Sequence, residues 1–285
     1  VQMPKMSEAE LKQAIRIEAD RYVPFELDEC VIDCQPLTRK AARGGEGEAK
    51  DQNVADTMGV LLVACRQQTV DEQVKLVQQQ GLQPIAIDVD AFALANAWEL
   101  CGLPAEDLAN EPAADGTTPR EERAIALVDI GASRTSINVL CGGETCFSRE
   151  IGIGGHDMTQ AVARKLGLEV FEAEAIKRAG DDKETEVARA IQPVLEDLTN
   201  EISLSLDYVE NHEGLRVEEV LLSGGGVLAP GCVAYVEQAT GRPTRTWNPL
   251  EGLRIAEDRV DVEELETWAP SLVVALGLAS RVRAA

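Results

Sequence analysis

The chain has 285 residues, of which 45% are hydrophobic and 27% charged, and this composition excludes general disorder. Its 27 Lys and Arg residues are outnumbered by 50 Asp and Glu, so the formal net charge is -23. A surface this acidic repels phosphate backbones and anionic lipids, which argues against nucleic-acid binding and direct membrane docking.

The first hundred residues predict a small α+β unit with the order α-β-β-α-β-α. Ser7 with Glu10 three residues later is a capping-box pattern, and it predicts a helix that Pro24 ends. Thr69 and Glu72 predict a second capped helix that Gly81 closes. The other predicted elements are strands at 29–37, 57–65 and 83–89, a solvated polar loop at 38–56, and a helix from Asp90 to about Leu100.

A different order of elements follows residues 103–123, which are proline-containing, acidic and without periodicity, and which we interpret as a linker. The pattern then predicts three strands, three helices, a short strand and two further helices. The three strands are predicted at 124–128, 135–140 and 145–151, and the three helices at 157–166, 169–179 and 184–210. The short strand is predicted at 220–222. The two further helices are one that follows Pro230 and stops at Gly241 and a terminal helix at 271–281.

A buried strand that ends in Asp129 carries the first chemical signal. The chain turns there through Gly131, Ala132 and Ser133 into an alternating second strand. Such a turn directs backbone N–H groups outward, where they can hold phosphate oxygens, and the carboxylate can hold a hydrated magnesium ion. An ordinary hairpin with an Asx-type turn is the alternative.

Two glycine-rich turns carry the next signals. Gly224, Gly225 and Gly226 follow a strand and permit close approach of a flat ligand, or form only a flexible connection. Gly154 and Gly155 precede a helix whose N-terminus favours anions. Their spacing is not that of a dinucleotide fingerprint, and no glycine in the chain is followed by lysine, which excludes a P-loop.

Glu174 and Lys177 lie three residues apart on a predicted helix, so they share one face. Taken alone, they are most simply interpreted as a surface ion pair that contributes little.

Cysteine and histidine usage limits the remaining chemistry. Seven cysteines without a CxxC motif indicate buried thiols in a reducing cytoplasm, although Cys141 and Cys146 flank one turn and allow a hairpin disulfide. With only His156 and His212, a histidine-rich metal site or a Ser-His-Asp triad has almost no histidine to draw on. The longest apolar stretch, 272–279, is far short of the ~20 residues of a membrane span, and we expect no signal peptide.

The order of the four signals resembles the second half of the actin-like ATPase superfamily. The resemblance implies an α/β, ribonuclease H-like fold that binds ATP and magnesium. It assigns Asp129, Gly131, Ala132 and Ser133 to phosphate and magnesium, Glu174 and Lys177 to the ribose, Gly224, Gly225 and Gly226 to adenosine, and Gly154 and Gly155 to the family's glycine pair. Two weaker matches are Asp90, near the attacking water as the catalytic candidate, and Gly277, at the second interdomain crossover.

Within the superfamily, residues 18–29 resemble the entry to the inserted 1C subdomain of the PilM family of type IV pilus assembly proteins. Residues 147–159 are also closer to that family than to FtsA, the cell-division actin. The alternative for Tyr22, Pro24 and Phe25 is simple packing under a helix end.

This resemblance implies a 1C-like (SHS2-like) α+β subdomain at 1–86 and a connecting helix and linker at 87–123. A nucleotide-binding lobe 2 is expected at 124–268, and a terminal helix that returns to lobe 1 at 269–285. Nothing before Ser7 matches the superfamily's first phosphate loop. We therefore expect an incomplete first lobe: the sequence is either a fragment or a product that holds nucleotide abnormally.

The expected function is that of a cytoplasmic adaptor, peripheral at the inner membrane through its partners. It would bind ATP and magnesium with weak hydrolysis at most and bind the cytoplasmic N-terminal peptide of the inner-membrane protein PilN, and self-association is a further option. Three alternatives stay open: an FtsA-like cell-division actin, a small-metabolite kinase of the same superfamily, and a structural module without nucleotide.

Overall fold

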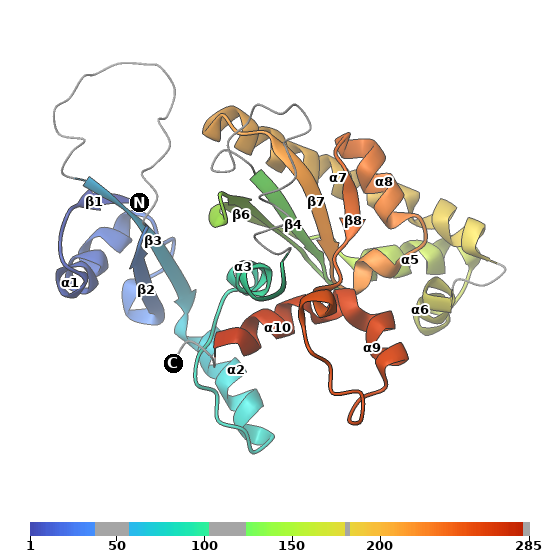
Figure 1. Ribbon diagram of the computed structural model, residues 1–285, viewed down its shortest axis with the longest axis horizontal. Helices are drawn as coiled ribbons and strands as arrows, with labels where there is room; N and C mark the ends of the chain where they lie inside the picture. The colour runs from blue at the N-terminus through green and yellow to red at the C-terminus, as the bar shows by residue number, and fades with distance from the viewer. Residues whose placement is uncertain (38–56, 103–123, 180–182, 282–285) are drawn as a thin grey trace. The chain divides into compact units, whose positions relative to one another are not determined.

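The computed structural model describes residues 1–37, 57–102, 124–179 and 183–281 (Figure 1). The predicted loop at 38–56 and the predicted linker at 103–123 lie outside the described residues. The chain divides into two compact units, Val1–Ile87 and Asp88–Ala285.

The first unit is a three-stranded antiparallel sheet with the strand order β1-β3-β2. Met3, Leu11, Ile15 and Val60 form its buried core between the sheet and the first helix. The strands are β1 (Gln2–Pro4), β2 (Cys30–Pro36) and β3 (Thr57–Arg66), and the helices are α1 (Glu8–Glu18), α2 (Gln67–Gln79) and two 3₁₀ turns, Ala19–Arg21 and Leu27–Glu29.

The capping box of Ser7 and Glu10 is confirmed, whereas two other predictions for this unit are wrong. Helix α2 begins at Gln67 with Arg66 as its N-cap, so Thr69 lies inside the helix and caps nothing. The predicted strand at 83–89 has no ladder partner among the described residues, and the Ile85 side chain is 75% exposed. An alternating apolar pattern predicts a strand only where a neighbouring strand can pair with it. The three-residue strand β1 was not predicted.

The second unit contains a five-stranded mixed sheet with the order β6-β5-β4-β7-β8. Strands β4, β5 and β6 form an antiparallel meander, and β7 and β8 extend it in parallel from β4. Their bounds are β4 (Ala124–Ile130), β5 (Thr135–Cys141), β6 (Glu144–Ile151), β7 (Val217–Ser223) and β8 (Thr244–Thr246). The very short β8 was not predicted.

Helices cover both faces of this sheet (Figure 1). The α-helices of the unit are α3 (Asp90–Cys101), α5 (Gly155–Leu166), α6 (Val170–Ala179), α7 (Glu184–Glu213), α8 (Cys232–Thr240), α9 (Val262–Trp268) and α10 (Val273–Ser280). The described residues of the unit also form three 3₁₀ turns, Gly225–Leu228, Pro249–Gly252 and Ala269–Leu272. All of the α-helices named here except α9 were predicted from the sequence, and the ends of the predicted helices differ from the observed ends by a few residues.

Side chains alternate along β4, so successive residues lie on opposite faces of the sheet. Val128 and Ile130 pack with α5, α7 and α8, whereas Leu127 packs with α3 and α10. Because side chains alternate across a strand, Asp129 shares the α3 side with Leu127. Within the described residues, no helix is long and apolar enough to cross a membrane.

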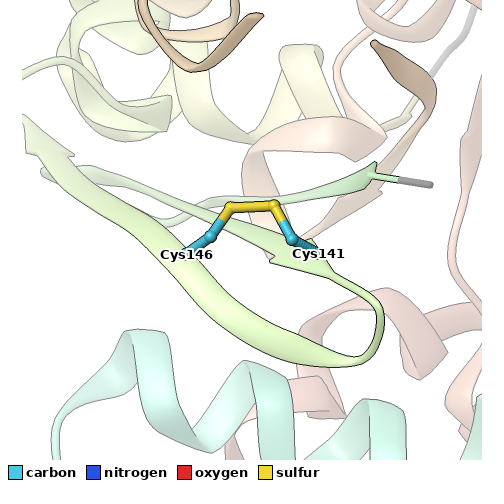
Figure 2. The surroundings of a disulfide bond; sticks show 2 residues. All are labelled: Cys141 and Cys146. Carbon is cyan, nitrogen blue, oxygen red and sulfur yellow. A yellow bond between two sulfur atoms is a disulfide. The ribbon is translucent and has the colours of Figure 1, made fainter. Parts of the chain in front are cut away.

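A disulfide joins Cys141 of β5 to Cys146 of β6 across the hairpin (Figure 2). The expectation that all seven cysteines are reduced thiols is therefore wrong for this pair, and the alternative of a hairpin disulfide is what the structure contains. Cys30, Cys34, Cys65, Cys101 and Cys232 are free. Burial raises the pKa of the Cys232 thiol to about 12, so this group behaves as a small apolar side chain.

Candidate functional site

Polar side chains form a row across four neighbouring strands of the second sheet. Asp129 of β4 is the register partner of Ser223 on β7 and of Ser136 on β5, and Ser136 is in turn the partner of Glu150 on β6. Directly paired residues share a face of the sheet, so the row lies on the same side as helix α3. The row places two carboxylates and two hydroxyls on one face of the sheet.

Asp129 is held in a partly buried position at the end of β4. The Ser223 hydroxyl donates a hydrogen bond of 2.8 Å to its Oδ1 atom. Burial raises the pKa of Asp129; the Ser223 hydrogen bond opposes that shift, and the negative charge of Asp90 adds to it. A cation stabilises a carboxylate that lies beside a second carboxylate. The sequence predicted a magnesium ion at this position.

Asp129 opens onto a cavity of about 240 Å³, here called the Asp129 cavity. Its volume is below the roughly 300–1,000 Å³ of a typical small-molecule pocket, so it fits the phosphate end of a nucleotide rather than the whole molecule. Its lining residues are Asp90, Asp129, Gly131, Ala132, Ser133, Arg134, Ser136 and Glu150.

The donor set of this cavity fits a hard divalent cation. Its carboxylates and hydroxyls are oxygen ligands, which Mg²⁺ prefers. No cluster of three or more His, Cys, Asp or Glu with metal-binding geometry exists in the described part of the chain. A magnesium ion at Asp129 would therefore take its remaining ligands from water and from the phosphates of a nucleotide, as is usual for Mg²⁺.

The turn after Asp129 is tied to the start of helix α5 by its backbone. The Gly131 N–H closes the turn by donating to the Arg134 carbonyl at 2.9 Å. The Gly131 and Ala132 carbonyls then accept hydrogen bonds from the N–H groups of Gly155 and His156, at 2.9 and 2.6 Å. The turn and the helix N-terminus consequently form one rigid unit.

Gly154 and Gly155 serve this contact between the turn and the helix. A Cβ atom at Gly154 would lie 2.7 Å from the Ala132 carbonyl oxygen, so only glycine allows the approach. The Gly154 N–H donates to Asp157 Oδ2 at 2.9 Å. The first N–H groups of α5 thus donate to protein acceptors, and the anion-binding role predicted for this helix start has no free donor among them.

The Lys177 ammonium is buried, with 7% of the side chain exposed, so the interpretation as a surface ion pair is wrong for this residue. Its Nζ atom donates to the Gly155 carbonyl at 2.9 Å, to Thr159 Oγ1 at 2.8 Å and to Glu174 Oε2 at 2.8 Å. An ammonium group has three hydrogens, so these acceptors use all of them. Lys177 therefore joins α6 to the N-terminus of α5.

Glu174 keeps part of its carboxylate accessible, with 35% of the side chain exposed. Burial by itself raises the pKa of Glu174, but hydrogen bonds from Lys177 and Thr159 and the charges of Lys177 and Arg178 outweigh burial and lower it. The group is therefore ionised at neutral pH and can accept further hydrogen bonds, for example from ribose hydroxyls.

The three glycines after β7 differ in their roles. Gly224 has a φ of +88° and donates its N–H to the Pro270 carbonyl at 2.8 Å. A Cβ atom at Gly224 or Gly226 would overlap with Ile130 at the end of β4, whereas one at Gly225 would meet only Ser271 Oγ, at 3.7 Å. Gly224 and Gly226 thus allow the two strand ends to pack closely.

Asp90 and Gly277 are both related to helix α3, one as its first residue and the other as a packing contact. Asp90 is the first residue of α3 and lines the Asp129 cavity. Gly277 lies in α10, where a Cβ atom would overlap with the Ala93 carbonyl, so this glycine lets α10 approach α3. The Asn138 amide on β5 donates to the Ala91 carbonyl at 2.6 Å and fixes the start of the same helix.

The structure thus brings most of the predicted residues together, in two adjoining groups. Asp90 and the turn residues line the Asp129 cavity, and Gly155 contacts both Lys177 and Gly226 beside it. Gly277 acts through α3 and does not line this cavity. Sequence reasoning missed Ser223, Thr159, Asn138, Arg134 and Glu150 as site residues; of these, Ser223 had a signal, since it stands between a buried strand and three glycines.

The family described as type IV pilus assembly protein PilM matches residues 1–283 of this chain. The chain belongs to the PilM family. A solved structure described as the PilM-PilN type IV pilus biogenesis complex is 33% identical with a TM-score of 0.78, over 99% of this chain and 74% of that one. This PilM-family chain therefore has the actin-like ATPase fold.

A more distant solved structure agrees with the fold of this PilM-family chain, and a curated protein shares part of its sequence. MreB5 of Spiroplasma citri bound to AMPPNP is 12% identical with a TM-score of 0.51, over 77% of this chain and 66% of that one. The ethanolamine utilization protein EutJ of Escherichia coli K12 is 29% identical over 137 residues, which are 48% of this chain and 45% of that protein. The chain spans roughly half of that curated relative.

Proposed function

We propose that this chain is an actin-like, ATP-binding adaptor of type IV pilus assembly that binds the cytoplasmic N-terminal peptide of a PilN-like inner-membrane protein. The observation that carries the proposal is the 33% identity to the PilM-PilN complex over 99% of the chain. The proposal places the protein in the cytoplasm, at the inner membrane through that partner.

The proposed nucleotide site uses the two adjoining groups. Gly131, Ala132 and Ser133 line the Asp129 cavity, where the turn would hold phosphates through the N–H groups of Ala132 and Ser133, since the Gly131 N–H already donates to Arg134, and magnesium would lie at Asp129. Glu174 would accept the ribose hydroxyls, and Lys177 would position Glu174. Gly225 leaves open space beside Ser271, where the adenine side of the ligand would pack.

Hydrolysis at this site is proposed to be weak. Asp90 lines the cavity and is the candidate that would orient a water molecule. Asp129 lines the same cavity, so a cation at Asp129 would offset the negative charge of both carboxylates beside that water. ATP binding would therefore act mainly by selecting a conformation of the adaptor.

The first unit offers apolar surface for a peptide. Tyr22 is 54% exposed and Ile17 is 78% exposed. The Arg66 guanidinium stacks on the Phe25 ring, with its Cζ atom 4.3 Å from the ring centroid. Strand β2 is also an edge strand of the three-stranded sheet, where an extended peptide can add by backbone hydrogen bonds. These features support a peptide-binding role for this unit.

The test is calorimetric titration of the complete gene product with ATP and Mg²⁺, and separately with a synthetic peptide of the cytoplasmic N-terminus of the PilN-like protein from the same genome. Binding of both is the expected result. Binding of the peptide without ATP would favour the nucleotide-free structural module. ATP turnover that requires an added sugar or polyol would favour the metabolite kinase.

A further inference from the structure

The Asp129 cavity has an unusual charge for a phosphate site. Three carboxylates, those of Asp90, Asp129 and Glu150, line it, and among its described lining residues only Arg134 is cationic. Three negative charges repel a triphosphate, and one divalent cation at Asp129 offsets only part of them. A second positive charge close to the phosphates is needed for tight binding.

Lys177 cannot supply that charge in this arrangement. It does not line the cavity, and its three hydrogens already bind Gly155, Thr159 and Glu174. Arg134 differs because the Gly131 N–H holds its backbone at the end of the turn, while its side chain lines the cavity and is 68% exposed.

The Arg134 guanidinium is held at the cavity by a single carboxylate. Its Nη1 atom donates to Glu150 Oε1 at 2.9 Å, and Glu150 is 54% exposed. An exposed ion pair of this kind contributes only about 0–1 kcal/mol. A charge-assisted hydrogen bond to a phosphate is stronger, so a phosphate in the cavity can displace Glu150 from Arg134.

We propose that Arg134 is a specificity-determining residue that exchanges its Glu150 partner for the terminal phosphate of a bound nucleotide, and so distinguishes a nucleoside triphosphate from a monophosphate. The inference rests on the proposed nucleotide site. Arg134 is positioned by the turn, and Glu150 is the carboxylate that it leaves. No bond is made or broken other than this ion pair and its hydrogen bonds.

The experiment measures the affinities of ATP, ADP and AMP with Mg²⁺ for the complete gene product and for the Arg134→Gln variant. We expect ATP affinity to fall about tenfold or more, and AMP affinity to stay within about twofold, because only the longer phosphate chain reaches the guanidinium. Arg149→Gln is the matched control, since Arg149 lies on β6 beside Glu150 but pairs with Glu201 outside the cavity.

Glu150→Gln supplies the second arm. Without the competing carboxylate, ATP binds more tightly, and in a double-mutant cycle this gain disappears when Arg134 is also glutamine. An equal change in ATP and AMP affinity on Arg134→Gln, or none, overturns the inference while the proposed nucleotide site stands. Absence of all nucleotide binding in the unmutated protein overturns both.

Discussion

The Ser223 hydroxyl and the Asp129 carboxylate form a hydrogen bond of 2.8 Å between residues 94 positions apart in the chain. This contact joins the ends of β7 and β4 and places the glycine turn after one strand beside the acidic turn after the other. Both turns belong to the proposed nucleotide site, so the pair is the structural link between its two halves.

Replacing Asp129 by asparagine should raise the stability of the fold and weaken the binding of ATP and magnesium. Burial raises the pKa of Asp129, so the folded protein binds this proton more tightly than the unfolded chain does. Ionisation therefore destabilises the fold, and stability falls as pH rises from the unfolded pKa through the folded one. At pH 7, Asp129→Asn should raise the free energy of unfolding in urea and reduce ATP–Mg affinity about tenfold or more.

The matched control for Asp129 is Asp197→Asn on the exposed face of α7, which should change neither quantity. Unaltered ATP–Mg affinity in Asp129→Asn would show that the cation and phosphates bind elsewhere.

Lys177→Met should destabilise the second unit because it removes the donor shared by three acceptors. The buried Thr159 hydroxyl and the Gly155 carbonyl lose a partner, and Glu174 keeps Arg178 but loses the Lys177 ion pair. We expect the free energy of unfolding to fall by about 1–3 kcal/mol. Chemical denaturation measures it, with the exposed Lys165→Met on α5 as the control. An equal effect of both substitutions would contradict the tethering role of Lys177.

Glu174 predicts a pH dependence of opposite sign to that of Asp129. Although burial alone would raise its pKa, the bonds and charges around the carboxylate lower the pKa in the folded state. The stability that it contributes is therefore present above the unfolded pKa and is lost as pH falls through the folded pKa. Glu174→Gln should flatten the acid side of a thermal-stability profile, and an unchanged profile would contradict this.

Gly277→Ala tests the close approach of α10 to α3. Alanine favours an isolated helix by about 1 kcal/mol over glycine, but here its Cβ atom would overlap with the Ala93 carbonyl. We expect a net loss of about 1–3 kcal/mol of stability, with weaker ATP binding because Asp90 begins α3. Gly152→Ala is the control, since no atom lies within 4 Å of the added Cβ. Stabilisation by Gly277→Ala would show that the helices can separate freely.

The Cys141–Cys146 disulfide closes a short loop across the β5–β6 hairpin (Figure 2). Reduction by dithiothreitol should lower the free energy of unfolding by about 2 kcal/mol, the chain-entropy value for a loop of this length. The Cys146→Ala variant should show no response to the reductant. Alkylation of the unreduced, denatured protein that labels all seven cysteines instead of five would contradict the bond.

The sequence by itself determined most strands and helices of the second unit, though not β8 or α9, because β4 is a continuous apolar run, α7 is strongly periodic, and glycines follow both elements. It also determined the acidic turn, the glycine turns and the Glu174–Lys177 pair as candidates, since their residue types carry local chemistry. Tertiary structure alone decided that Lys177 is buried, that the first α5 N–H groups donate to the Gly131 and Ala132 carbonyls, and that Arg134 lines a cavity together with three carboxylates. These facts depend on strand register and on helix packing between residues far apart in the chain, which local patterns do not encode.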